Sequence, residues 1–154
     1  MQNYTKSQTR LAFVQYIFLS EFLKSSNNQD IIEFQDHFYN SNISNINEKK
    51  EFKFKFNKNF LNKLYNSYKI NCDKKIVFNE INHFVRIERK FENWDNVLKS
   101  LTLAIISELK ITDKNKMKIV FNDYLNISKS LVSSKETKLL NAVIQKYLDK
   151  YVIK

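Results

Sequence analysis

Apolar side chains recur every three to four positions along most of the chain, which is the spacing of one face of an α-helix. The first half contains three segments of this kind, separated by polar stretches. Their apolar positions are Leu11, Val14, Ile17, Phe18 and Phe22; then Ile31, Phe34 and Phe38, after the candidate N-cap Asp30; then Phe56, Phe60, Leu61, Leu64 and Tyr68. We expect three helices here, with a connecting loop over residues 41–50.

The last third contains three further helical patterns separated by short breaks. Their apolar positions are Trp94, Val97, Leu98, Leu101, Ile105 and Leu109; then Val120, Tyr124, Ile127 and Leu131; then Leu140, Val143, Ile144, Tyr147, Leu148 and Tyr151. Short connections predict that consecutive helices are antiparallel neighbours in a bundle. Ser133 and Glu136 have the spacing of a capping box, which predicts that the last helix begins there.

Two segments are ambiguous. Residues 75–91 are compatible with a further helix. Residues 51–56 (EFKFKF) alternate with a period of two, so a short strand is the alternative to a lead-in to a helix. Because the chain contains no Gly and no Pro, and tight two-residue hairpins favour Gly, a sheet-rich fold is disfavoured. The pattern therefore predicts an all-α fold, as one compact domain or as two small helical halves.

Composition is that of a globular protein. The 154 residues are 43% hydrophobic, and no apolar run approaches the roughly 20 residues needed to cross a bilayer. The N-terminus lacks the small-residue cleavage site of a signal peptide. A single cysteine, Cys72, excludes an internal disulfide framework. We expect a soluble cytoplasmic protein with no membrane association.

The net charge of +10 suggests an anionic partner such as nucleic acid. However, Lys, Asn, Ile, Phe and Tyr are all abundant, and A/T-rich codons encode these residues. A biased base composition therefore accounts for part of the lysine excess. An ordinary solvated basic surface is the alternative explanation.

Residues for catalysis are scarce. His37 and His83 are the two histidines, and neither has further ligands at a recurrent zinc spacing. A chain without glycine cannot form a Gly-rich phosphate loop. Glu108 and Asp123 lie beside apolar runs, where a cap or an inter-helix hydrogen bond explains them as well as acid–base chemistry does. We expect no enzyme activity, no catalytic residue, no metal and no cofactor.

Residues 119–152 resemble the C-terminal signature of the NusB family of transcription antitermination factors. That signature is an Asn–Glu pair in a helix ending Ala–Lys–x–Phe, then a capped turn and Phe–Val–Asn–Gly–Val–Leu. The matching positions are Asn122–Asp123, Ser128 to Leu131, and Leu140 to Ile144. Thr9 to Phe18 are similar to the N-terminal motif, and Val97–Ser100 with Ser107–Leu109 to a middle helix. Residues 27–93 do not align. Ala142 replaces the signature Gly, and the Arg-rich start is reduced to Lys6 and Arg10.

The resemblance implies a single NusB-like domain over residues 1–154, a bundle of about six to seven helices in two packed halves. The halves would be an N-terminal part of about residues 1–70 and a C-terminal part of about residues 75–154. It also implies that the chain binds boxA RNA of ribosomal RNA transcripts together with ribosomal small-subunit protein ten (NusE). The pair would help the RNA polymerase elongation complex to read through terminators.

Five residues are candidates for RNA contact. Lys6 and Arg10 are neighbours on one face of the first helix and suit phosphates, and Arg10 is preferred because Arg can also stack on a base. Phe18 matches the family aromatic and suits stacking, with a core role as the alternative. Lys135 and Lys138 flank the start of the last helix, where phosphates are favoured, or are ordinary surface lysines.

Three polar residues receive other roles. Glu108 is the candidate partner-binding residue, through its match to the family motif. We expect Asn122 and Asn141 to be buried hydrogen-bonding groups that fix the packing of the last two helices.

Two alternative functions stay open. One is a helical protein–protein adaptor of NusB fold with weakened or lost RNA binding. The other is a fragment containing the NusB-like domain that occurs fused to ribosomal RNA cytosine methyltransferases.

Overall fold

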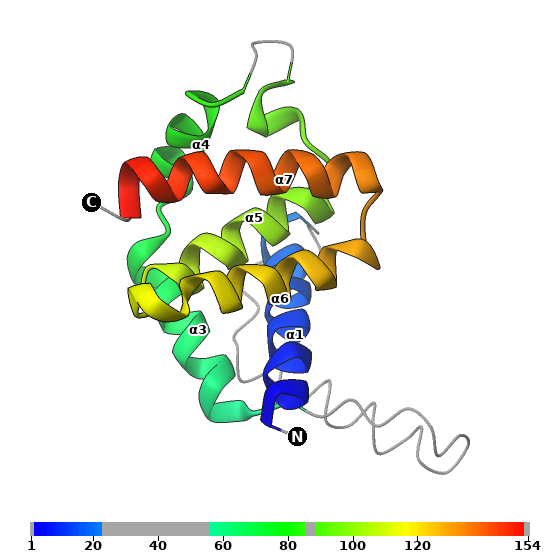
Figure 1. Ribbon diagram of the computed structural model, residues 1–154, viewed down its shortest axis with the longest axis vertical. Coiled ribbons are helices and arrows are strands. Elements are labelled where there is room, and N and C mark those ends of the chain that lie inside the picture. Colours follow the sequence, from blue (N-terminus) through cyan, green and yellow to red (C-terminus); the bar gives the residue numbers. More distant parts are fainter. Residues whose placement is uncertain (1, 23–55, 86–88, 153–154) are drawn as a thin grey trace. The chain divides into compact units, whose positions relative to one another are not determined.

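The structure, a computed structural model, describes residues 2–22, 56–85 and 89–152 (Figure 1). These ranges contain α-helices and no strand. The helices are α1 (Gln2–Phe22), α3 (Lys58–Asn71), α4 (Lys74–Asn82), α5 (Asn96–Leu109), α6 (Met117–Lys129) and α7 (Ser134–Tyr147). Short helical turns lie at Phe91–Asn93, Lys114–Lys116 and Leu148–Val152. The all-α prediction is confirmed. The helix expected after Asp30, the loop 41–50 and most of the ambiguous segment 51–56 lie outside the described residues.

The chain divides into two compact units, Met1–Tyr65 and Asn66–Lys154, with the division inside α3. We call them unit 1 and unit 2 and describe each by itself. Within the described residues, no helix is long and apolar enough to span a membrane.

In unit 1, Thr9 links α1 to the beginning of α3. The Thr9 hydroxyl accepts a hydrogen bond from the Asn57 backbone N–H at 2.9 Å and donates to the Thr5 carbonyl at 2.8 Å. The Asn57 side chain accepts from the Phe60 N–H at 3.0 Å, which satisfies one of the N–H groups left free at the start of a helix. These bonds position the first turn of α3 beside α1.

The buried face of α1 differs in part from the predicted one. Val14 and Ile17 are buried as expected, but Leu11, Phe18 and Phe22 are half-buried. Ala12, Phe13 and Tyr16 are buried instead. The Tyr16 ring meets the Tyr65 ring edge-to-face with centroids 5.4 Å apart, and burial beside Tyr65 raises the pKa of the Tyr16 hydroxyl.

Unit 2 is built around α5. From Ser100 to Leu109 every residue of this helix is buried, and α5, α6 and α7 contact one another. Figure 1 shows α5 and α6 running in opposite directions, and α6 and α7 likewise, so the predicted antiparallel order is confirmed. Because α5 has no solvated face, its hydroxyl groups need internal partners. Ser100, Thr102 and Ser107 each donate to the carbonyl four residues earlier, at 2.7–2.8 Å.

Of the ambiguous segment 75–91, which was compatible with a helix, α4 covers the part up to Asn82, where the helix ends. The Asn82 side chain accepts from the Phe91 N–H and donates to Glu92, both at 2.7 Å, which also lowers the pKa of Glu92. The Phe91 ring is buried edge-to-face against Phe78 and Trp94. A hydrogen bond between residues nine apart thus turns the chain back where periodicity alone would continue the helix.

The capping box at the start of α7 is confirmed. The Glu136 N–H donates to the Ser133 hydroxyl oxygen at 3.2 Å, and the Ser133 N–H donates to the Glu136 carboxylate at 3.1 Å.

At the other end of α7 the Tyr147 hydroxyl donates to Glu80 of α4 at 3.0 Å. Burial and the neighbouring carboxylate raise the pKa of Tyr147.

Replacing Ser133 with Ala should lower the free energy of unfolding by about 1 kcal/mol, because the helix loses its side-chain cap. That change corresponds to a drop in Tm of about 2–4 °C for a chain of this size. Circular dichroism during thermal denaturation measures it. Ser134→Ala is the matched control, since Ser134 is also exposed but lies inside the helix, and it should leave Tm nearly unchanged. Equal effects of both substitutions would contradict the capping role.

Candidate nucleic-acid interface

In unit 1, the two cations predicted to contact RNA lie over one aromatic ring. The Lys6 Nζ atom is 6.0 Å and the Arg10 Cζ atom 5.5 Å from the centre of the Phe60 ring. Both are within cation–π range, where the negative face of the ring attracts positive charge. The sequence predicted that Lys6 and Arg10 share a face of α1, but it contained no sign that Phe60 would meet them.

Exposure separates these two cations. Lys6 is exposed, whereas Arg10 is only 7% exposed. The Arg10 side chain is therefore committed mainly to contacts inside the protein, and Lys6 is the more accessible partner for a phosphate. This reverses the order of preference that the sequence suggested. Phe18 is half-buried and its ring lies 6.4 Å from that of Phe22, so part of the ring is reachable from solvent.

In unit 2, Lys135 and Lys138 are both exposed near the start of α7. The capping box alters the electrostatic environment that was expected around these two lysines. The Ser133 hydroxyl already accepts from the Glu136 N–H, and Glu136 adds a carboxylate at the helix start. An incoming phosphate would meet this carboxylate, so the helix N-terminus offers less to an anion than the sequence suggested. The lysine side chains themselves are the available cationic groups.

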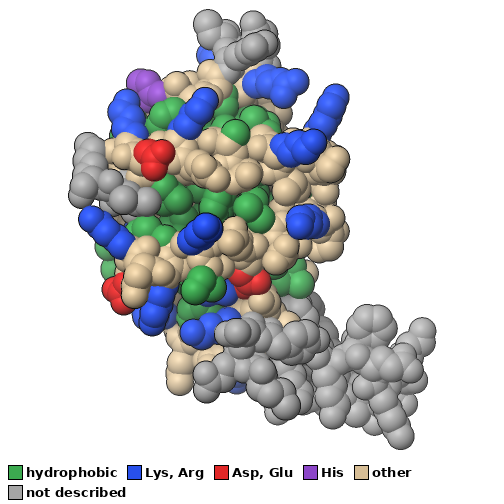
Figure 2. Space-filling model, in the orientation of Figure 1, with side chains coloured by type: hydrophobic (Ala, Val, Ile, Leu, Met, Phe, Trp, Pro, Cys, Tyr) green, Lys and Arg blue, Asp and Glu red, His purple; other side chains and the backbone are tan. Residues whose placement is uncertain are grey.

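A polar groove lies between α6 and α7, with a volume of about 460 Å³. We call it the amide groove, because three asparagines line it together with two lysines. Its lining residues are Asn122, Leu125, Asn126, Lys129, Thr137, Lys138 and Asn141. None of these described residues is acidic. In the view of Figure 2, Lys and Arg side chains are spread over the face formed by α6 and α7, and acidic side chains are sparse there.

The prediction that Asn122 and Asn141 are buried is wrong. Asn122 is exposed and Asn141 half-buried, with its side-chain oxygen accepting from Gln145 at 3.1 Å. The asparagines border the buried face rather than lie in it. One polar contact that joins the two helices is between the hydroxyls of Ser128 and Thr137, 3.2 Å apart. The signal for the groove was the helical spacing of Asn122, Asn126 and Lys129, which places them along one side of α6.

The amide groove has the chemistry of a site for single-stranded nucleic acid. A carboxamide both donates and accepts, so it can pair with the exposed edge of an unstacked base. The lysines can meet the phosphates that join such bases. The structure therefore brings Lys138 together with five polar residues that sequence reasoning did not group with it.

Glu108, the candidate partner-binding residue, is 3% exposed. Its carboxylate accepts a hydrogen bond from the hydroxyl of Tyr124, which is fully buried, at 2.7 Å. In this conformation Glu108 presents no surface to a partner protein. The geometry assigns it the role of joining α5 to α6 inside unit 2.

Other chemistry is sparse in the described part of the chain. No group of three His, Cys, Asp or Glu side chains there is arranged to hold a metal ion. Cys72 is a buried free thiol. Comparison of the chain with protein-family models, with curated proteins and with solved structures found no match.

Replacing Tyr124 with Phe removes the hydroxyl that donates to Glu108. We expect the free energy of unfolding to fall by about 1–3 kcal/mol, because a buried carboxylate loses a donor. Urea denaturation followed by circular dichroism measures this. Tyr151→Phe is the control, since Tyr151 is half-buried and packs through its ring against Tyr147. If Tyr124→Phe left stability unchanged, the internal role of Glu108 would be wrong.

Proposed function

We propose that the chain is a NusB-like transcription antitermination factor. It binds boxA-type RNA of ribosomal RNA transcripts together with NusE and acts on the RNA polymerase elongation complex in the cytoplasm. The amide groove is the observation that carries the proposal. It lies in the segment whose sequence resembles the NusB signature, and it combines base-pairing amides with cations in one cavity. The role requires no catalytic residue and no cofactor from this chain.

Two further features support RNA as the ligand. Lys6 is exposed on α1 beside an aromatic ring, and the chain has a net charge of +10. Phosphate contacts supply much of the affinity for nucleic acid, so binding should weaken as salt concentration rises. The amides would contribute the preference for one sequence over another, because base edges carry that information.

One observation favours a second function, that of a helical adaptor which binds a protein partner but little RNA. Arg10 is 7% exposed and faces Phe60, so the N-terminal helix offers RNA less positive charge than its sequence suggests. An adaptor of this kind would retain binding to NusE. Its affinity for boxA RNA would not exceed that for a scrambled RNA.

Fluorescence anisotropy with labelled RNA distinguishes the two functions. The purified chain, alone and with NusE, is titrated into boxA RNA and into a scrambled RNA of the same composition. The antitermination proposal predicts tighter binding to boxA, strengthened by NusE and weakened by salt. Equal binding to both RNAs by the complex with NusE refutes the proposal, and the adaptor function then remains if NusE is still bound.

Lys6→Ala should weaken boxA binding several-fold. The slope of log affinity against log salt concentration should fall by about one, which corresponds to the loss of one phosphate contact. Its Tm should stay near that of the unaltered protein, because Lys6 is exposed. Lys63→Ala, which removes an exposed lysine of α3 in the same unit, is the matched control and should bind normally. Arg10→Ala should differ from both by lowering Tm, since it uncovers part of the Phe60 ring. An unchanged salt slope in Lys6→Ala would exclude a phosphate contact by Lys6.

A further inference from the structure

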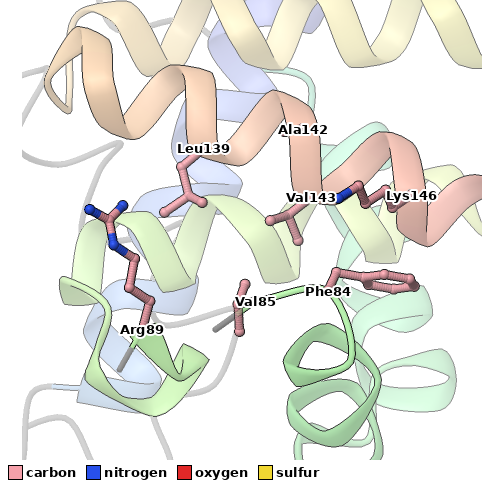
Figure 3. A pocket seen from close by; sticks show the side chains of 7 residues that line it. All are labelled: Phe84, Val85, Arg89, Leu139, Ala142, Val143 and Lys146. Carbon is pink, nitrogen blue, oxygen red and sulfur yellow. The ribbon is translucent and has the colours of Figure 1, made fainter. Parts of the chain in front are cut away.

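A second cavity of unit 2 differs from the amide groove in chemistry. It has a volume of about 410 Å³, and five of its lining residues are apolar. We call it the apolar pocket. Leu139, Ala142 and Val143 of α7 form one wall, and Phe84 and Val85, which follow α4, form the other. Figure 3 shows Leu139 and Val143 pointing from α7 toward Val85.

Four of these five apolar side chains are incompletely covered, and the fifth, Val143, is buried. Ala142 is exposed, and Leu139, Phe84 and Val85 are each half-buried. The Phe84 ring packs edge-to-face against Tyr151 with centroids 6.1 Å apart, which holds that wall in position. The pocket is therefore a preformed apolar cavity that another apolar side chain can enter. Binding would be favoured because apolar surface is removed from water.

Two cations flank the apolar walls. Arg89 and Lys146 line the pocket, both are exposed, and Figure 3 shows them on opposite sides of Leu139 and Val143. None of the described lining residues is acidic. The acidic residues nearest to the pocket along α7 and the turn that follows it are Glu136, three positions before Leu139, and Asp149, three positions after Lys146, and neither lines the pocket. A ligand with carboxylates on both sides of an apolar group would complement this arrangement.

From these observations we propose that the apolar pocket docks a short acidic segment of a partner protein. An apolar side chain of that segment enters between α7 and Val85, and flanking Asp or Glu residues pair with Arg89 and Lys146. The pocket is too small for more than a few side chains, which suits a linear segment with one anchor. A second copy of this chain fits less well, because two chains of charge +10 repel each other.

The proposal goes beyond RNA binding and does not depend on it. The pocket uses residues of α7 that do not line the amide groove, where Lys138 and Asn141 lie. The apolar walls also lack the donors and acceptors that read base edges. The complex with boxA RNA should therefore form whether or not the apolar pocket is filled.

The probe is a library of random peptides of about twelve residues displayed on phage and selected on the full chain. We expect the enriched peptides to share a large apolar residue with Asp or Glu on both sides. Synthetic copies with those acids changed to Asn or Gln should bind at least about tenfold more weakly by anisotropy, because they lose charge pairing with two cations.

Three variants locate the binding site of the enriched peptides. Ala142→Tyr fills the pocket, and Arg89→Gln combined with Lys146→Gln removes its cations; each should weaken binding about tenfold. Lys118→Gln is the matched control, because Lys118 is an exposed lysine of α6 in the same unit that lines neither the apolar pocket nor the amide groove. Its affinity should be unchanged. Circular dichroism and boxA binding verify that all variants are folded and that RNA recognition is separate.

Several results would overturn the proposal. Enriched peptides without acidic residues, or peptides that bind Ala142→Tyr as tightly as the unaltered chain, would show that the pocket is not an acidic docking site. A dimer seen by sedimentation and lost in Ala142→Tyr would identify a second copy as the occupant. A loss of boxA affinity in the double Arg89/Lys146 variant would assign the pocket to RNA.

Discussion

The burial of α5 on all sides is the constraint on which the rest of unit 2 depends. A helix with no solvated face must satisfy every polar side chain internally, and α5 does so in two ways. Its hydroxyl residues donate back to the carbonyls of their own helix, as Thr102 does to Leu98. Its carboxylate, Glu108, meets the Tyr124 hydroxyl of α6. The polar residues of this helix, which resemble candidates for binding or catalysis, are thus the residues whose internal hydrogen bonds allow the helix to be buried.

Because α5 is buried, the candidate binding residues of unit 2 lie on other elements, mainly α6 and α7. The two sides of α7 then differ sharply in chemistry. Lys138 and Asn141 line the amide groove, whereas Leu139, Ala142 and Val143 line the apolar pocket. One helix can therefore meet a nucleic acid on one side and a protein segment on the other. This division fits a protein whose proposed role is to join RNA to a protein assembly.

The sequence was sufficient to predict the structure where the signal is local and strongly periodic. The last three helices, their antiparallel order and the capping box at Ser133 were predictable because each depends on residues a few positions apart. The buried face of α1 was not, because apolar residues run almost continuously from Leu11 to Leu19 and several faces fit. The end of α4 depends on the bond from Phe91 to Asn82, which no local pattern encodes.

The candidate site was less predictable than the fold. Charge and family resemblance selected Lys6, Arg10 and Lys138, but exposure decides which of them a ligand reaches. The burial of Arg10 depends on Phe60, which is fifty positions away in the sequence. The asparagines of the amide groove resembled core residues, because they border apolar positions on both helices. Their exposure follows from the rotation of α6 and α7 about their axes, which tertiary packing sets.

Nuclear magnetic resonance of the labelled chain tests the central claim most directly, namely that RNA binds outside a helical core that stays unchanged. Addition of boxA RNA with NusE, compared with NusE alone, should shift the side-chain amide signals of Asn122, Asn126 and Asn141. The backbone signals from Leu101 to Ile106 in α5 should stay in place, since those residues are buried. Unshifted asparagine signals at saturating RNA, or the same shifts with a scrambled RNA, would contradict the account.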